Sequence, residues 1–231
     1  MLALLLAAVA CTHIVVVGDT SNHLQFIADL KTIYSVSLQE NLPEPSKLNL
    51  VVFGSVSVAP FLEAGANLML LGDSDLSVLS LRKSSDVVDV MSTDQSKDTV
   101  STHSPADSFI DARNVFYQGP FFIAGKNKLL LPLLTASETA YADSAAGTDL
   151  IAVPAFVALN DARLVAAADA IFISDRFIDS SRTNANRKFA IDAAKWVFHN
   201  TGVLRIHKWR HHRVNEVQQR GVYRIQDKIV L

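Results

Sequence analysis

The sequence contains a single cysteine, Cys11, and only nine glycines among its 231 residues. One cysteine excludes an internal disulfide and any zinc site built from several thiolates. The glycines form no GxGxxG or GxxxxGK[ST] pattern, and the Gly125-Lys126 pair lacks both the earlier glycine and the hydroxyl residue of such a loop. The common phosphate-binding loops are therefore not present in the sequence.

Charge is sparse as well, because Asp, Glu, Lys and Arg make up 19% of the chain and the formal net charge is −2. This balance gives no overall attraction to polyanions, so nucleic acid is not an expected partner. Beyond the N-terminus, no apolar run reaches the roughly eighteen residues of a membrane-spanning helix. With 49% hydrophobic residues, the chain can bury one sizeable core, and we expect a single domain over residues 11–231.

The N-terminal residues 1–10 read MLALLLAAVA and form the most apolar stretch of the chain. Ala8 and Ala10 on either side of Val9 fit the small-x-small pattern of a signal-peptidase site, which predicts a signal peptide over residues 1–10. Since this stretch contains no Lys or Arg, an apolar lead-in to the first strand remains an alternative. A lipoprotein signal, with Cys11 as the first mature residue, is a further one.

Short apolar runs alternate with helical patterns in the first third of the chain. The runs at residues 12–17, 34–38, 48–53 and 67–71 read as strands, and helices are expected near residues 24–30 and 59–64. Strands that are apolar throughout are typical of a sheet covered on both faces. The pattern predicts an α/β fold with a mainly parallel sheet and helices on both faces.

The following segments are less regular. Residues 84–111 are rich in Ser, Thr and Asp, and we expect them to form a surface excursion. Pro120 and Pro132 interrupt the apolar residues that follow, which favours short strands or edge pieces. Residues 140–148 are small and read as a loop. Residues 150–159 and 164–173 read as two further buried segments.

The last helical pattern leads into a basic segment. Asn184 or Asn186 can cap the start of the helix, and Gly202 is expected to mark its end. Residues 187–224 contain nine Lys or Arg against two Asp or Glu, whereas the preceding residues contain eleven against twenty. A solvated face or a docking surface for an acidic partner explains this asymmetry. The apolar residues that define the helix are Phe189, Ile191, Ala194, Trp196, Val197 and Phe198.

Three local patterns could carry chemistry, and none specifies a reaction. Gly18 follows the first strand, where open α/β sheets bind ligands. Ser74 lies in a strand-to-helix turn, but the GxSxG elbow of hydrolases is absent and a helix cap explains the same turn. His207 and His211 are four residues apart, yet the neighbouring Lys and Arg would repel a metal ion. The residues themselves therefore indicate no catalytic, cofactor or metal site.

Three separated segments resemble a known family. They are FYQGPFFIAG…LLLPLLTASETAYA at residues 116–142, NDARLVAAADAIFISDRFID at residues 160–179, and AKWVFHNTGVLRIHKWRHHRVNE at residues 194–216. In their order and spacing they are similar to the DDOST, or Wbp-type, subunit of the eukaryotic oligosaccharyltransferase. The matching details include Leu134-Thr135-Ala136-Ser137 followed by Tyr141, Asn160-x-Ala162-Arg163, and Ser174-Asp175-x-Phe177.

The resemblance implies a lumenal α/β domain of glutamine-amidotransferase-like (Rossmann- or flavodoxin-like) form in the endoplasmic reticulum. It implies an accessory, non-catalytic role in the transfer of a dolichol-linked oligosaccharide to asparagine. The implied partners are the catalytic and accessory subunits, which would also account for membrane association. No cofactor is implied. In that family a β-rich domain and a membrane helix follow, and the resemblance covers neither.

We therefore predict an accessory subunit that scaffolds the complex, with a basic C-terminal segment at about residues 200–231 that docks a neighbouring subunit. Two alternatives remain. One is a small serine hydrolase that uses Ser74, and the other is a ligand-binding, amidotransferase-like module with its site near Gly18. The predicted docking residues are Arg205, Lys208, Arg210, His211, His212 and Arg213.

Overall fold

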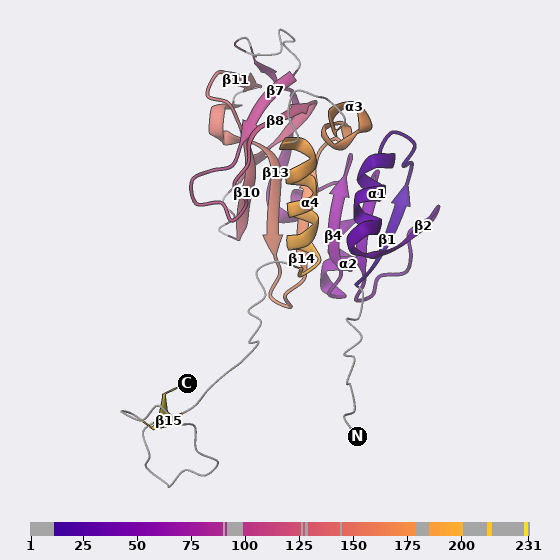
Figure 1. The fold of residues 1–231 in the computed structure, drawn as a ribbon. Helices are drawn as coiled ribbons and strands as arrows, with labels where there is room; N and C mark the ends of the chain where they lie inside the picture. The colour runs from indigo at the N-terminus through magenta and orange to yellow at the C-terminus, as the bar shows by residue number, and fades with distance from the viewer. Residues whose placement is uncertain are drawn as a thin grey trace, which may run out of the picture. The chain divides into compact units, whose positions relative to one another are not determined.

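The computed structural model describes residues 12–89, 91, 99–125, 127, 129–143, 145–178, 185–200, 212–213 and 229–230. The chain divides into two compact units, residues 1–200 and residues 201–231. The first unit contains the main sheet and its helices (Figure 1). In the second, strands β15 (His212–Arg213) and β16 (Ile229–Val230) pair antiparallel.

The N-terminal part of the main sheet is parallel, and its order is β2-β1-β3-β4-β14. Its first four strands confirm the strands predicted near residues 12–17, 34–38, 48–53 and 67–71. Apolar side chains without charges allow β1, β3 and β4 to be buried on both faces. The five strands are β1 (His13–Gly18), β2 (Ser35–Gln39), β3 (Asn49–Phe53), β4 (Asn67–Leu71) and β14 (Arg163–Ala167).

The remainder of the sheet is antiparallel, in the order β14-β13-β10-β7-β8, with β9 pairing β13 and β5 pairing β9. Over the whole sheet, six pairings are antiparallel and four are parallel. The prediction of a mainly parallel, amidotransferase-like sheet is therefore wrong. The additional strands are β5 (Leu81–Asp86), β7 (Thr99–His103), β8 (Arg113–Gln118), β9 (Pro120–Ala124), β10 (Leu130–Ala136) and β13 (Leu150–Val157).

Loop length accounts for two of the six antiparallel pairings, β7 with β8 and β13 with β14. Residues 104–112 join β7 to β8, and residues 158–162 join β13 to β14. Both connections are shorter than the crossover of a dozen or so residues that parallel neighbours need. Apolar composition identifies a buried strand but does not indicate its direction, so the prediction extended the parallel pattern of the first strands too far.

Two segments predicted to lie outside the sheet contain strands. Residues 84–111 include the end of β5 and all of β7, where Val100 and Thr102 are fully buried. The Thr102 hydroxyl donates to the Val115 carbonyl at 2.7 Å, which makes a polar residue compatible with burial. Residues 140–148 contain two short strands of a separate three-stranded sheet. Its strands are β6 (Val88–Asp89), β11 (Ala140–Ala142) and β12 (Ala145–Ala146).

Pro132 lies inside strand β10, although proline was expected to interrupt the strands of this region. Pro132 lies opposite Pro154 of β13, next to a register shift in the ladder. A bulge is one of the few places where a strand accepts proline, because no ladder hydrogen bond is lost there. β10 lies between β13 and β7, so of the two predicted alternatives, short strands or edge pieces, the edge piece is wrong for this strand.

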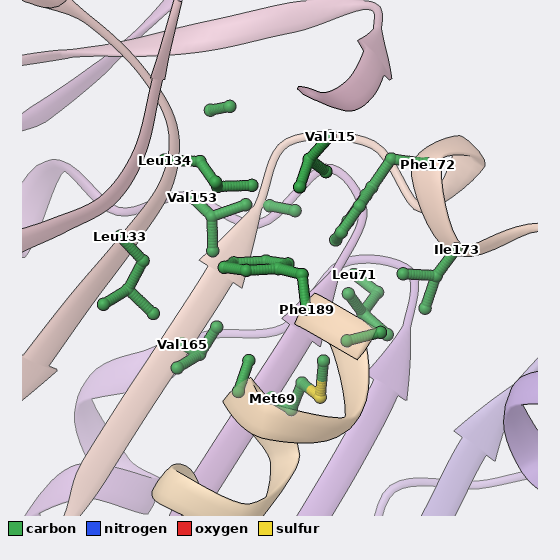
Figure 2. Packing of buried hydrophobic residues seen from close by; sticks show 14 of the residues in the cluster. Met69, Leu71, Val115, Leu133, Leu134, Val153, Val165, Phe172, Ile173 and Phe189 are labelled. Carbon is green, nitrogen blue, oxygen red and sulfur yellow. The ribbon is translucent and has the colours of Figure 1, made fainter. Parts of the chain in front are cut away.

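Helices cover both faces of the sheet, and Figure 1 shows α1 and α4 in front of it. α1 and α4 pack on one face, where Phe189 of α4 lies at the centre of the core cluster, between Val153 and Phe172 (Figure 2). α2 and the 3₁₀ helix η1 pack on the other face through Phe61 and Leu79. The helices are α1 (Leu24–Ile33), α2 (Val58–Glu63), α3 (Asp175–Ile178) and α4 (Ala185–Val197), with 3₁₀ helices η1 (Ser77–Leu79), η2 (Gly147–Asp149) and η3 (Ile171–Ile173).

α4 ends earlier than Gly202, the predicted terminator. His199 adopts a left-handed φ of 58°. The Asn200 N–H donates to the Lys195 carbonyl at 2.7 Å, and the His199 N–H donates to the Trp196 carbonyl at 3.2 Å. These two bonds form a Schellman motif in which His199 takes the position that glycine usually occupies.

Candidate functional site

The carboxyl edge of the parallel strands is where an α/β sheet of this order would bind a ligand. From β1 the chain passes to β2 on one side and then returns to β3 on the other. The strand order reverses between β1 and β3, and such a switch point normally opens a crevice beyond the strand ends. Gly18 ends β1 and Gly54 follows β3, so both lie at this point.

In this chain the protein itself closes the crevice. Gly18 has φ of 101°, and a Cβ placed there would lie 2.0 Å from the Phe53 carbonyl oxygen. The His23 ring stacks on the Phe53 ring, with centroids 4.6 Å apart and an interplanar angle of 15°. Burial lowers the pKa of His23, which favours the neutral imidazole. The predicted ligand-binding site near Gly18 is thus occupied by backbone and by His23.

The start of α1 is also occupied. The N–H groups of Leu24 and Gln25 donate to the Asp175 carboxylate at 3.2 and 2.9 Å, and the Asp175 N–H donates to the Asn22 carbonyl at 2.8 Å. A helix N-terminus in this position is where nucleotide phosphates bind in related sheets. Here a carboxylate of the same chain takes the place of that anion.

A cavity of about 400 Å³ remains beside these residues, lined by Asn22, His23, Asp169, Ile171, Ser174 and Arg176. Two buried atoms facing this region, His23 Nδ1 and Ser174 Oγ, have no hydrogen-bond partner within the described part of the chain. The two are therefore not bonded to each other, as a nucleophile and its base would be. The cavity offers polar contacts without an assembled catalytic pair.

Ser74, the predicted hydrolase nucleophile, is a structural residue. Its hydroxyl donates to the Gly54 carbonyl and accepts from the Val56 N–H, each at 3.3 Å. The side chain is 7% exposed. Both bonds hold the loop that follows β3, and neither leads to a histidine that could activate the hydroxyl. The arrangement gives no support to the serine hydrolase alternative.

Polar residues of the family-like segments bind helix ends. Asn160 Nδ2 donates to the Leu62 carbonyl at the end of α2 at 2.8 Å. Arg163 Nη1 donates to the Trp196 carbonyl at the end of α4 at 2.8 Å, and its guanidinium lies 5.1 Å from the Trp196 ring centroid. Asp175 pairs two N–H groups at the start of α1, whereas Asn160 and Arg163 add a second hydrogen bond to carbonyls that already accept the N–H groups of Gly65 and His199. The sequence showed these residues but not their partners.

Asn186 binds a strand edge and does not cap α4 as predicted. Its Oδ1 accepts from the Phe116 N–H at 3.0 Å, and its Nδ2 donates to the carbonyls of Phe116 and Phe172, both at 2.7 Å. The residue is 1% exposed and lies in the first turn of α4. Its amide therefore pairs with β8 as a neighbouring strand would, while also fixing η3.

Asp89 organises the small sheet next to Ser137 of the family-like segment. Its carboxylate accepts from the hydroxyls of Ser137 and Thr139 at 2.6 and 2.7 Å and from the Met91 N–H at 3.0 Å. Burial opposes ionisation, but the three hydrogen bonds outweigh it and lower the pKa of Asp89. This acid has only structural donors around it.

Several predicted sites cannot be placed. Residues 1–10, Cys11, Asn184, Gly202 and His207 lie outside the described residues, as do the side chains of the predicted docking residues, Arg205, Lys208, Arg210, His211, His212 and Arg213. Within the described ranges, no three His, Cys, Asp or Glu side chains come close enough to hold a metal ion. No helix in that part of the chain is both long and apolar enough to cross a membrane.

Comparison with solved structures places the fold. The mmIFT52 N-terminal domain superposes with a TM-score of 0.61 over 84% of this chain and 100% of that one, at 11% sequence identity. Identity at this level indicates a shared fold and nothing about activity. The mixed sheet accordingly has a counterpart among known domains.

Sequence comparison identifies the family. Relatives are 48 kDa subunits of dolichyl-diphosphooligosaccharide–protein glycosyltransferase. The one from Arabidopsis thaliana is 32% identical over 45% of this chain and 28% of its own length. The one from Drosophila melanogaster is 32% identical over 52% of this chain and 32% of its own length. The one from Danio rerio is 28% identical over 50% of this chain and 31% of its own length. The chain thus spans about three tenths of these relatives. The sequence model of the family described as OST48, N-terminal domain, matches residues 55–200. Because this match covers more than half of the chain, the protein belongs to the OST48 N-terminal domain family.

Proposed function

We propose that this chain is an accessory, non-catalytic subunit of the oligosaccharyltransferase that transfers a dolichol-linked oligosaccharide to asparagine. Its relatives are named as subunits of a dolichyl-diphosphooligosaccharide–protein glycosyltransferase. The main observation behind the proposal is that polar residues of the family-like segments hydrogen-bond to helix ends of the same domain. Asp175, Asn160 and Arg163 each bind a helix end of their own fold, so they stabilise a body instead of forming a catalytic site.

The proposed mechanism is scaffolding. One terminus each of α1, α2 and α4 is hydrogen-bonded to a side chain from a distant segment, and these bonds make the domain rigid. A rigid domain of this kind would hold neighbouring subunits in fixed positions relative to one another. The proposed partners are the catalytic and accessory subunits on the lumenal side of the endoplasmic reticulum membrane, and membrane association would come through them.

We further propose that residues 1–10 act as a signal peptide, that residues 11–231 form the lumenal domain, and that the basic segment at about residues 200–231 docks a neighbouring subunit. The charge distribution supports this docking, because residues 187–224 contain nine basic residues against two acidic ones. An acidic face on the partner would be attracted to such a segment.

Loss of the chain tests the functional assignment. Deleting it from its source cells should lower the occupancy of N-glycosylation sites, measured by mass spectrometry of secreted glycoproteins. Re-expression of the wild-type chain or of Ser74→Ala should restore occupancy equally, since Ser74 serves only the loop after β3. Unchanged occupancy in the deletion strain would reject an oligosaccharyltransferase role. Rescue by the wild type but not by Ser74→Ala, with the variant folded, would favour a serine enzyme instead.

Charge reversal tests the docking segment. Replacing Arg205, Lys208, Arg210 and Arg213 together by Glu should release the chain from the complex while its melting temperature stays unchanged. A control variant reverses four exposed cations of the first unit, Lys31, Lys47, Arg82 and Arg113. We expect the control to co-purify normally. Equal recovery of both variants with the complex would show that the basic segment is not the contact.

A further inference from the structure

The main path of the sheet ends at β2 and at β8, and a branch through β9 ends at β5. An edge strand presents N–H and C=O groups that have no neighbouring strand to bond with. Proteins usually block such edges with charges, prolines, bulges or a covering element. The β8 edge and the β2 edge differ in how they are protected.

The β8 edge is covered at Phe116. The outward N–H and C=O groups of Phe116 both bond to the Asn186 side chain, at 3.0 and 2.7 Å. Asn186 is held by the buried face of α4, so the cover is a fixed part of the fold. An incoming strand would have to displace it.

The β2 edge has no such cover among the described residues. The Ser35 N–H donates to the Thr12 carbonyl beside β1 at 3.2 Å, which directs the backbone groups of Ser35 toward β1. Since backbone groups alternate in direction along a strand, those of Ser37 and Gln39 also point to β1. The N–H and C=O groups of Val36 and Leu38 therefore point to the free edge.

The sequence of β2 also lacks the features that usually block an edge. It reads SVSLQ, without charge or proline, and it pairs with β1 in unbroken register from Ser35 to Gln39. Leu38 is 54% exposed, and Leu42 in the following loop is 41% exposed. An unblocked edge with apolar side chains beside it is the arrangement used for strand addition.

We infer that the free edge of β2 receives an extended segment of a neighbouring polypeptide, which adds to the sheet as a further strand. This inference rests on the proposed function, because a subunit of a complex has such neighbours. The chemistry of the edge defines the segment. It is uncharged over about five residues, with apolar side chains on the face of Val36 and Leu38.

The charged and polar residues around β2 indicate which further side chains the added partner segment should carry. On the opposite face, the His13 ring bonds to the hydroxyls of Ser35 and Ser37, both at 3.1 Å, so small polar side chains fit there. The charged residues within positions 35–46 are Glu40 and Glu44, both exposed. A basic residue where the segment passes these carboxylates is therefore expected.

Amide hydrogen exchange of the purified complex tests the inference. In the isolated chain, the Val36 and Leu38 amides should exchange as exposed amides do, while the Ser37 amide is protected by β1. In the complex, the Val36 and Leu38 amides should slow by roughly tenfold or more, as those of an interior strand. Equal exchange at Val36 and Leu38 in the two samples would overturn the inference.

A proline variant tests the edge separately from the side chain. Leu38→Pro removes an N–H that faces outward and leaves the ladder with β1 intact. It should lower recovery of the chain with the complex on the order of tenfold, because strand addition depends on that donor. Leu38→Ala keeps the N–H and should be recovered better. Both variants should melt near the wild-type temperature, which shows that the fold persists.

The outcomes separate the inference from the proposed function. If the wild-type chain is recovered without any oligosaccharyltransferase subunit, the proposed function fails. If it is recovered with them, and Leu38→Pro is recovered equally well, only the strand addition fails. A stable homodimer of the purified chain that Leu38→Pro dissociates, measured by analytical ultracentrifugation, would identify a second copy as the occupant and overturn the inferred partner.

Discussion

Some residues of this domain lie at positions typical of a catalytic or ligand-binding residue but have a structural role instead. Ser74 sits where a nucleophile would stand, yet its hydroxyl joins Gly54 and Val56. Asp175 sits where a phosphate would bind, yet it caps α1. The residues themselves could be read from the sequence, but their partners could not, because each bond joins segments far apart in the chain.

The close approach at Gly18 gives the first prediction. Gly18→Ala places a methyl group against the Phe53 carbonyl at a left-handed φ, whereas at Gly54, with φ of 136°, a Cβ meets nothing within 4 Å. Both variants carry backbone strain of about 1–3 kcal/mol, and only Gly18→Ala adds a clash. Urea unfolding should therefore show the greater loss of unfolding free energy for Gly18→Ala. Equal losses would mean that the strand ends are not in contact.

The cap on α1 gives the second prediction. Asp175→Ala removes the acceptor of two helix N–H groups and should lower the unfolding free energy by about 1 kcal/mol. Asp107→Ala, at an exposed aspartate in the loop after β7, is the control and should change it by less than about 0.5 kcal/mol. The comparison uses equilibrium denaturation of the two variants. A loss at Asp107 as large as at Asp175 would refute the capping role.

Two histidines make stability depend on pH. Burial lowers the pKa of His23, and burial followed by the charge of Arg163 lowers the pKa of His199, both from 6.5. The unfolded chain then binds protons that the folded chain resists, so the unfolding free energy should fall as pH drops through 6.5. Asp89 has a lowered pKa, and its contribution should be lost only below about 3.8.

Denaturation between pH 5 and 8 measures this effect. His23→Phe keeps a ring on Phe53 but removes the titrating group, so its stability should change less with pH than that of the wild type. A slope that His23→Phe leaves unaltered would show that this ring does not resist protonation.

At the scale of elements, helix and strand identity could be predicted where the pattern is strong, and not where the sheet reverses. The parallel strands and α1 follow from apolar periodicity. β7 was missed because Thr99, Ser101 and Thr102 resemble a polar loop, although the Thr102 hydroxyl is satisfied by Val115. The end of α4 was misplaced because His199, not glycine, adopts the left-handed conformation.

The junction of α4 with β8 gives the element-scale prediction. Asn186→Ala leaves the N–H of Phe116 and the carbonyls of Phe116 and Phe172 without their partner. Each buried group left unpaired costs about 1–3 kcal/mol, so this variant should be among the most destabilised. Asn186→Asp keeps the acceptor and should lose less if it is tested below the pKa of the new acid. Wild-type stability of Asn186→Ala would show that α4 does not cover the β8 edge.

The first unit is built on a mixed sheet whose usual ligand crevice is closed and whose β2 and β8 edges differ in protection. The resemblance noted from the sequence gave the correct family, and the family assignment does not depend on sheet direction. The fold class was wrong because most antiparallel pairings join strands that are distant in the chain, and composition does not show which strands pair. The closed crevice and the hydrogen-bonded helix ends agree with the proposed scaffolding role.

Affinity purification of the tagged chain from detergent-solubilised membranes of its own source tests the central claim most directly. Mass spectrometry of the eluate, with the charge-reversed variant as the matched control, identifies what the chain binds. We expect the catalytic oligosaccharyltransferase subunit and its neighbours in amounts close to that of the chain, and their loss in the variant. Recovery of the wild-type chain alone, in the soluble fraction, would contradict the accessory role and leave only common ancestry with the family.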